Sequence, residues 1–272
     1  MKVADKVAIV TGGGNGIGAA LAAKLAHQDA RVVVADINSQ AADAVASGIN
    51  ADRAGTAIAS SGDVSDTEHI KQLIALAENE FGPVDLYFAN AGITGVSGLD
   101  VTEDEWDQSI DVNLRAHIRA AQLLVPGWVE RGEGYFVSTA SAAGLLTQLG
   151  SATYSVTKHA AVGFAEWLNI TFGDQGVRVS CLCPMGVNTN LLHSPGQSED
   201  PLARLATRAV TSAGDVIEPA DVAEIVLAAV EEERFLILPH PAVLEMYRHK
   251  GTDYDRWLRG MRRYQHSLME AL

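Results

Sequence analysis

The residues best suited to chemistry are Tyr154 and Lys158, which lie four positions apart in a segment with helical spacing. One turn of helix places two such side chains on the same face. A free phenol has a pKa of about 10 and is a poor base at neutral pH, but a neighbouring positive charge stabilises the phenolate. The pair could therefore move a proton. Taken alone, the pattern Tyr-x-x-x-Lys is common and usually means two neighbours on a helix surface.

A glycine-rich turn lies near the start of the chain, directly between an apolar run and a helical segment. Glycines let the backbone turn sharply and approach a pyrophosphate, while the free amides at the start of the following helix favour its negative charge. The strand before and the helix after make this pattern more specific than a glycine turn in isolation. The residues predicted to bind a dinucleotide here are Gly12, Asn15, Gly16, Ile17 and Gly18.

The second apolar run ends at Asp36, eighteen residues beyond Gly18. A carboxylate at this position can accept hydrogen bonds from the adenosine ribose hydroxyls, and it would repel the additional phosphate of NADP. Neither Asn15 nor Ile37 adds a positive charge that would hold that phosphate. The sequence therefore predicts NAD as the cofactor, bound in part by Asp36 and Ile37.

Short apolar runs alternate along the chain with alanine- and leucine-rich segments of helical spacing. Because several runs are apolar almost throughout, both faces of the sheet should be covered, which favours parallel strands with helices on each side. The predicted fold is α/β, a Rossmann-type doubly wound parallel sheet of about seven strands in a single domain over residues 1–272. The predicted strands are 6–11, 31–36, 56–60, 84–90, 135–138, 177–184 and 235–238, and the predicted helices are 17–27, 40–49, 67–81, 105–129, 154–173 and 220–231.

Composition excludes several classes of partner. Of the 272 residues, 47% are hydrophobic and 20% are charged, as in an ordinary globular protein. The formal net charge of −14 opposes binding to nucleic acid, whose phosphates a partner has to neutralise. The first ten residues lack the pattern of a secretion signal, and no apolar stretch is long enough to cross a bilayer. We expect a cytoplasmic protein that binds neither nucleic acid nor membrane.

The two cysteines, Cys181 and Cys183, are too close in one predicted strand to form an easy disulfide, and we expect both to be buried and unpaired. The eight histidines never form a His-x-x-x-His pattern, and Cys-x-x-Cys does not occur. We therefore expect no metal site.

With the spacing Thr-Gly-x-x-x-Gly-x-Gly at residues 11–18, the chain resembles the short-chain dehydrogenase/reductase family. The resemblance extends from about residue 5 to about residue 240. It implies a catalytic tetrad, with the usual interval of thirteen residues between the serine and the tyrosine. The four matching residues are Asn113, Ser141, Tyr154 and Lys158.

The resemblance implies a hydride transfer between nicotinamide and a carbinol carbon. Tyr154 is expected to take the alcohol proton in oxidation and to return a proton in reduction. Ser141 is expected to orient and polarise the substrate oxygen, and Lys158 to bind ribose hydroxyls as well. Asn113 is expected to support a water-linked proton relay; the alternative is a polar residue that satisfies an irregular helix backbone.

Other cofactor contacts are implied by the same resemblance. Asp63 and Val64 match the segment that contacts adenine, and Ala89 replaces the first asparagine of the family's Asn-Asn-Ala-Gly segment. Met185 replaces the usual glycine in the loop that holds the nicotinamide carboxamide, so its bulk could alter that loop or the substrate wall. The remaining expected contacts are Asn90, Ala91, Gly92, Pro184, Val187 and Thr189.

Apolar residues near the proposed tetrad favour an apolar secondary alcohol or ketone as substrate, although they could equally be core or interface residues. Residues 190–214 are predicted to form a substrate lid, with a surface loop as the alternative. Residues 240–272 are predicted to form an amphipathic tail, with its aromatic stripe docked. The candidate wall residues are Ile93, Leu145, Leu146, Leu149, Leu191 and Leu192.

Other functions remain open at this point. A noncatalytic NAD-binding sensor or scaffold would need the glycine turn and Asp36 but not the tetrad. A reductase of acyl-carrier-linked ketones predicts a basic docking patch, and a sugar alcohol dehydrogenase predicts a polar pocket. The resemblance further implies a homotetramer, with a dimer as the alternative, assembled through the helices at 105–129 and 154–173.

Overall fold

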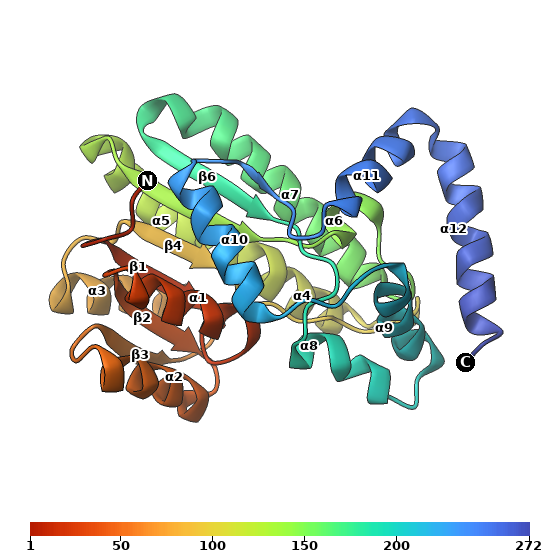
Figure 1. Cartoon of the computed structure of the whole chain (residues 1–272), viewed down its shortest axis with the longest axis horizontal. Helices are drawn as coiled ribbons and strands as arrows, with labels where there is room; N and C mark the ends of the chain where they lie inside the picture. Colours follow the sequence, from red (N-terminus) through yellow and green to blue (C-terminus); the bar gives the residue numbers. More distant parts are fainter.

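The computed structural model describes residues 1–272 and is built around one parallel sheet (Figure 1). The strand order is β3-β2-β1-β4-β5-β6-β7, and every neighbouring pair is parallel. The order reverses between β1 and β4, and in such sheets this is the point at which ligands bind, outside the carboxyl ends of the strands. The strands are β1 (Val7–Thr11), β2 (Arg31–Asp36), β3 (Ala57–Ser61), β4 (Leu86–Ala89), β5 (Gly134–Thr139), β6 (Val177–Leu182) and β7 (Leu236–Ile237).

Helices cover both faces of the sheet, as the apolar strands predicted, and the doubly wound fold is confirmed. One face carries α1 (Gly16–His27), α2 (Ser39–Asp52) and α10 (Pro219–Glu231), and the other carries α3 (Thr67–Glu80), α5 (Ala116–Arg131) and α7 (Ala152–Phe172). The remaining helices are α4 (Glu103–Ile110), α6 (Ala143–Leu146), α8 (Asn190–His193), α9 (Pro201–Ala213), α11 (Ala242–Thr252) and α12 (Tyr254–Met269).

Each strand supplies two separate cores because successive side chains point to opposite faces. In β1, Val7 and Ile9 belong to the core beneath α3, α5 and α7, whereas Ala8 and Val10 belong to the core beneath α1, α2 and α10. The two cores hold the strand ends rigidly, which fixes the loops that leave them. None of the helices is both long enough and apolar enough to span a membrane.

The helix predicted over 105–129 is not continuous. It is divided into α4 and α5 by a π-helical turn, η1 (Asp111–Arg115). A π turn inserts one residue into the helical repeat and is frequent at functional sites. Periodicity alone could not reveal it, because the turn keeps the chain helical on both sides.

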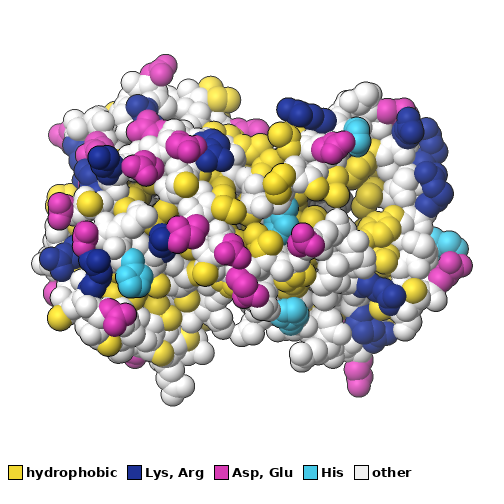
Figure 2. Space-filling model, in the orientation of Figure 1, with side chains coloured by type: hydrophobic (Ala, Val, Ile, Leu, Met, Phe, Trp, Pro, Cys, Tyr) yellow, Lys and Arg dark blue, Asp and Glu magenta, His cyan; other side chains and the backbone are white.

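The C-terminal tail also differs from the prediction of one docked helix. It breaks at Asp253, whose side chain accepts a hydrogen bond from Arg256 N–H and so starts α12. The distal end of α12 packs on α9 through Leu268, and the Tyr264 hydroxyl donates to Ala209 O at 3.0 Å. Figure 2 shows hydrophobic atoms in the hollow between α12 and the body of the molecule. Tyr254 and Leu258 remain exposed, so only part of the predicted stripe is docked.

Gly18→Ala is expected to destabilise the fold. A Cβ at this position would lie 2.0 Å from Gly12 O and 2.7 Å from Asn90 Nδ2, so α1 would have to move away from the turn. We expect a loss of about 3 kcal/mol in the free energy of unfolding, measured by urea denaturation.

The control for this substitution is Gly48→Ala in α2, where an added Cβ meets no atom within 4 Å. Alanine in an open helix interior is expected to stabilise the protein by about 0.5–1 kcal/mol. Equal unfolding midpoints for the two variants would show that the contact at Gly18 is not tight.

Candidate active site

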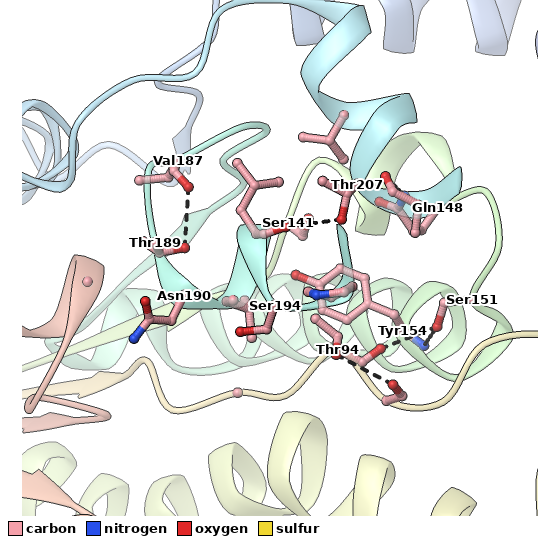
Figure 3. Close-up of a pocket in the computed structure, with 18 of the residues that line it drawn as sticks. Thr94, Ser141, Gln148, Ser151, Tyr154, Val187, Thr189, Asn190, Ser194 and Thr207 are labelled. Carbon is pink, nitrogen blue, oxygen red and sulfur yellow. Dashed lines mark hydrogen bonds between the residues drawn. The ribbon is translucent and has the colours of Figure 1, made fainter. Parts of the chain in front are cut away.

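A cavity of about 600 Å³ opens at the carboxyl ends of β1, β2, β4, β5 and β6. Its lining includes the glycine turn, the end of β2, the start of α7 and the segment 190–214. Figure 3 shows its middle and one end, with Thr189 and Asn190 on one side of Tyr154 and Gln148 and Ser151 on the other. The cavity is therefore long, and Tyr154 lies between its ends.

At one end of the cavity, the Asp36 carboxylate lies beside the glycine turn. Asp36 Oδ2 accepts from Gly14 N–H at 2.9 Å, and Oδ1 accepts from Asn38 N–H at 2.9 Å. The two amides hold the carboxylate in place, and each oxygen keeps a lone pair for another donor. Asp36 is thus fixed in a position from which it can bind hydroxyl groups in the cavity.

The glycine turn has no room for side chains. Gly16 has a φ of +51°, and a Cβ there would lie 2.8 Å from Thr189 Cγ2. Asn15 caps α1 by accepting from Gly16 N–H at 2.7 Å, and the first residues of α1, Gly16 and Ile17, line the cavity. A helix N-terminus open to a cavity is a site for a phosphate group. The residues present therefore fit the pyrophosphate of a dinucleotide.

Asn90 joins three strand ends. Its Nδ2 donates to Thr11 O at 3.0 Å, and its Oδ1 accepts from the Thr139 hydroxyl at 3.3 Å. Thr11 Oγ1 in turn accepts from the backbone N–H groups of Asn90 and Ala91. These bonds tie β1, β4 and β5 together at the floor of the cavity, so the replacement at Ala89 leaves the connection intact.

Tyr154 and Lys158 share one face of α7, as their spacing predicts. Lys158 Nζ lies 5.6 Å from the centre of the Tyr154 ring and donates to Thr139 O at 2.9 Å. Ser151 starts α7 by accepting from Tyr154 N–H, so the helix begins two residues earlier than expected. Burial lowers the pKa of Lys158 to about 8. The ammonium is therefore still mostly charged at neutral pH.

The side chains around Tyr154 do not by themselves lower the pKa of its phenol in the way that the sequence led us to expect. Burial raises the pKa of the Tyr154 phenol, while a hydrogen bond with the Ser141 side chain acts in the opposite direction. The phenolate loses hydration inside the protein, and this effect exceeds the help that its neighbours give. A lowered pKa would need an additional positive charge in the cavity.

Asn113 lies in the π turn, fully buried, and its side chain is used for positioning. Oδ1 accepts from Ile93 N–H and Nδ2 donates to Ile93 O, both at 2.9 Å, and Nδ2 also donates to Thr157 Oγ1 at 3.2 Å. Asn113 thus connects the loop after β4 to α7. These bonds go to other segments, so the alternative of an asparagine serving its own helix is wrong, and the water-linked relay stays a prediction.

The cavity brings together most of the residues predicted from sequence. Asn113, which is fully buried, does not line it, and neither do Gly18, Ile37, Asp63 and Val64. Gly18 packs against the turn, and Ile37 is exposed. Asp63 caps its own loop by accepting from Ser65 N–H, and Val64 is buried. Their contacts with a cofactor stay predictions.

The predicted apolar wall is largely wrong. Only Leu191 and Leu192 line the cavity. Leu145 and Leu146 belong to the core, and Leu149 packs against the small cluster beneath α12. A short apolar sequence looks the same in a core and in a pocket. Here Leu145 and Leu146 are buried because α6 packs against α7.

Met185 does contribute to the cavity wall, and it also packs against the core. Its backbone is held by His240, a residue that the sequence did not single out. Met185 N–H donates to His240 Nδ1 at 3.1 Å, and His240 Nε2 donates to Gly186 O at 3.0 Å. The imidazole thus binds two neighbouring backbone groups of the loop that carries Pro184, Val187 and Thr189.

A second buried histidine was also missed. His117 Nδ1 lies 3.0 Å from Ser138 Oγ, and its Nε2 has no partner in the protein. Burial, together with the positive charge of Lys158, lowers the pKa of His117 to about 3. It therefore stays neutral at working pH and adds no second charge behind Lys158. Its position four residues after Asn113 on one helix was the only available signal.

The two cysteines are buried and unpaired, with Sγ atoms 3.8 Å apart. No group of three or more His, Cys, Asp or Glu side chains is arranged to hold a metal ion.

A doubly wound sheet with a glycine turn at its switch point, facing a tyrosine and a lysine in the same cavity, defines an oxidoreductase of the nucleotide-binding class. Comparison with known proteins agrees with this class. The family profile described as short chain dehydrogenase matches residues 6–200. The chain belongs to the short-chain dehydrogenase/reductase family.

Individual relatives span most of the chain. It is 32% identical over 238 residues to a cyclohexanol dehydrogenase of Acinetobacter sp., covering 85% of this chain and 90% of the relative. It is 32% identical over 242 residues to the 1-deoxy-11-beta-hydroxypentalenate dehydrogenase of Streptomyces exfoliatus, covering 87% and 84%. The crystal structure of a family member from Burkholderia phymatum in complex with NAD is 30% identical, with a TM-score of 0.85 and coverage of 94% and 96%.

Proposed function

We propose that the protein is an NAD-dependent oxidoreductase that interconverts a secondary alcohol and its ketone, with Tyr154 as the acid/base. The observation that carries this proposal is the convergence of Tyr154, Ser141 and Lys158 in the cavity that also holds the glycine turn and Asp36. A noncatalytic NAD sensor would need only the glycine turn and Asp36.

Three observations support NAD over NADP. The Asp36 carboxylate lies at the place expected for the adenosine ribose, and Lys158 is the only lysine or arginine that lines the cavity. A phosphate on that ribose would meet a negative charge with no basic partner. The relative from Burkholderia phymatum, which matches over nearly its whole length, was crystallised with NAD.

NAD, when bound, accepts a hydride from the alcohol carbon or returns one to the ketone. The chain supplies the rest of the chemistry. Ser141 Oγ accepts from Ala143 N–H at 3.1 Å and donates to Pro184 O over a long distance of 3.5 Å. The hydroxyl can exchange this long bond for one to the substrate oxygen. Tyr154 takes the hydroxyl proton in oxidation and donates one in reduction. Lys158 holds a positive charge beneath the phenol and keeps hydrogen atoms available for ribose hydroxyls.

The substrate is proposed to have a largely apolar body. Met185, Leu191, Leu192 and Val210 contribute apolar side chains to the cavity lining. The names of the relatives, a cyclohexanol dehydrogenase and a hydroxypentalenate dehydrogenase, agree with an alicyclic alcohol. The segment 190–214 is proposed to act as a lid, since both α8 and α9 contribute to the lining.

The direct test is a screen for NADH formation from secondary alcohols, followed at 340 nm, with cyclohexanol as the first compound. We expect turnover with NAD and little with NADP. A chain that binds NAD tightly but forms no NADH with any alcohol in the screen, and consumes none with the matching ketones, would be a sensor or scaffold instead.

Asp36→Ala is expected to change the cofactor preference. Loss of a charged hydrogen-bond acceptor for the ribose is worth about 1.5–3 kcal/mol, so kcat/KM for NAD should fall by roughly 10- to 100-fold. Removing the negative charge should at the same time raise kcat/KM for NADP. The measurement is the ratio of the two values, and an unaltered ratio would count against the ribose contact.

Assembly and compartment also remain proposals. Val156, Trp167 and Ile170 form an exposed apolar stripe on α7, which supports the homotetramer implied by the family. A cytoplasmic location is proposed from the sequence alone.

A further inference from the structure

The part of the cavity beyond Tyr154 is less apolar than its leucines indicate. Gln148 lies on its wall (Figure 3), and Gln148 Nε2 donates to Leu149 O at 3.2 Å and to Ala206 O at 3.1 Å. These two bonds use both hydrogens of the amide, so they also fix which way the amide is turned. Oε1 has no hydrogen-bond partner within the protein. Gln148 is thus held as a hydrogen-bond acceptor.

A second acceptor lies on the same wall. Asp200 is half-buried, lines the cavity and caps α9, where its Oδ1 accepts from Leu202 N–H at 2.9 Å. Its Oδ2 has no partner within the protein. The Asp200 N–H donates to Ser198 Oγ at 3.1 Å, which fixes the start of α9 and with it the carboxylate.

The charges around these acceptors restrict the chemical class of group that can bind to them. The only cation of the lining, Lys158, is buried beside Tyr154. An anionic group on the substrate would meet Asp200 without a basic partner. An organic cation would find no aromatic wall, because Tyr154 is the only aromatic residue in the lining. A neutral hydrogen-bond donor satisfies both acceptors.

We propose that the substrate of this site carries, besides the reacting carbinol, a further hydroxyl group that donates to Gln148 Oε1, with Asp200 as a second acceptor. The substrate class is a cyclic diol or polyol whose one side is apolar enough to contact Met185 and Leu192. This inference rests on the proposed function, because it concerns the substrate of the same reaction. It differs from the apolar alcohol that the sequence favoured by one additional hydroxyl group.

The physical basis is the difference between a satisfied and an unsatisfied acceptor. A substrate without the second hydroxyl leaves Gln148 Oε1 facing an apolar group after water is expelled, and a site built to bind a hydroxyl discriminates against such an analogue. For a neutral bond we expect about a tenfold preference in kcat/KM.

The experiment compares cyclohexanol with 1,2-, 1,3- and 1,4-cyclohexanediol in the wild-type enzyme with NAD. We expect at least one diol to exceed cyclohexanol about tenfold in kcat/KM. Gln148→Leu should bring this ratio to about one, and Asp200→Asn, which keeps an oxygen for the cap, should lower it in part. The ratio is the readout because a general disturbance of the fold lowers both rates together.

Two further variants distinguish the effect of the Gln148 acceptor oxygen from the effect of altered packing in the cavity wall. Gln148→Glu keeps an acceptor oxygen but loses the bonds to Leu149 O and Ala206 O that fix its position, and it should retain part of the diol preference. Thr207→Val removes a hydroxyl that already donates to Leu192 O on the same wall, and it should not change the ratio. The inference is overturned if cyclohexanol equals every diol, if Gln148→Leu keeps the preference, or if 2-aminocyclohexanol exceeds the diols.

A failure of the proposed function can be distinguished from a failure of the second-hydroxyl inference. If no alcohol gives NADH, the same compounds are titrated calorimetrically into the NAD-loaded Tyr154→Phe variant, which reports binding without turnover. Tighter binding of a diol that is lost with Gln148→Leu supports the second hydroxyl. Equal affinities for cyclohexanol and all three diols overturn it.

Discussion

Tyr154→Phe is expected to lower kcat for NADH formation by about 1000-fold and to change the affinity for NAD by less than about threefold. In the proposed mechanism the phenol oxygen moves the substrate proton, and acid/base catalysis by a positioned side chain contributes roughly 10²–10⁴-fold. The ring itself stays, so its packing between Ser141 and Lys158 is preserved. Measurements of steady-state turnover and of NAD binding by calorimetry separate the two effects.

The matched control is Tyr247→Phe, which removes the same hydroxyl from an exposed side chain of α11. Turnover of this variant should equal that of the wild type. A Tyr154→Phe enzyme with wild-type kcat would refute the proton-transfer assignment, and one that no longer binds NAD would show that the hydroxyl belongs to the cofactor site instead.

Lys158→Met is expected to lower kcat/KM by about 100-fold while making the folded chain more stable. The lost charge raises the pKa of the Tyr154 phenol, so less phenolate is present during oxidation and the pH at which kcat is half-maximal moves upward. Methionine has a similar length and fills the same buried space. The pH dependence of alcohol oxidation measures this effect.

The stability gain follows from the buried charge. The pKa of Lys158 is about 8 in the folded chain against 10.5 for the ordinary side chain, so a charged Lys158 at pH 7 destabilises the fold by an amount on the order of 3 kcal/mol. The unfolded chain binds more protons between these two values, so wild-type stability rises from pH 8 to about 10.5. The loss of the bond to Thr139 O offsets about 1 kcal/mol. The advantage of the variant should therefore be full at pH 7 and largely gone at pH 10.

Urea unfolding at pH 7 and at pH 10 tests this prediction. Lys250→Met is the control, because Lys250 is also buried and donates to a backbone carbonyl, Leu145 O at 2.6 Å, but lies outside the cavity. Its turnover should stay within a few-fold of the wild type. A Lys158→Met chain that is less stable than the wild type at pH 7 would mean that the ammonium is better solvated than its burial indicates.

The fold could be predicted from sequence because its signals are local. Runs such as Val32–Ala35 are apolar at every position, which is required of a strand covered on both faces, and the glycine turn has a strand before it and a helix after it. Tyr154 and Lys158 could be placed together because four residues make one helical turn. Each of these inferences uses only neighbours in the sequence or a regular period.

The parts that could not be predicted depend on contacts between distant segments. Asn113 bonds to Ile93 and Thr157 across a π turn that has no sequence period of its own. Gln148 becomes a fixed acceptor only because Ala206 O, 58 residues away, takes one of its hydrogens. The sequence leaves Leu145 and Leu146 as candidates for either the substrate wall or the core, because apolar residues near Ser141 look alike whether they face a pocket or a core.

The pair of bonds from His240 to the Met185–Gly186 backbone has a consequence for engineering. This imidazole follows β7 and precedes the two C-terminal helices, α11 and α12. A chimera that takes its C-terminus from another protein will keep the support of this loop only if the junction lies after His240. A graft that begins one residue earlier exchanges the histidine as well, and with it the geometry of Val187 and Thr189, even though no residue of the cavity itself has been altered.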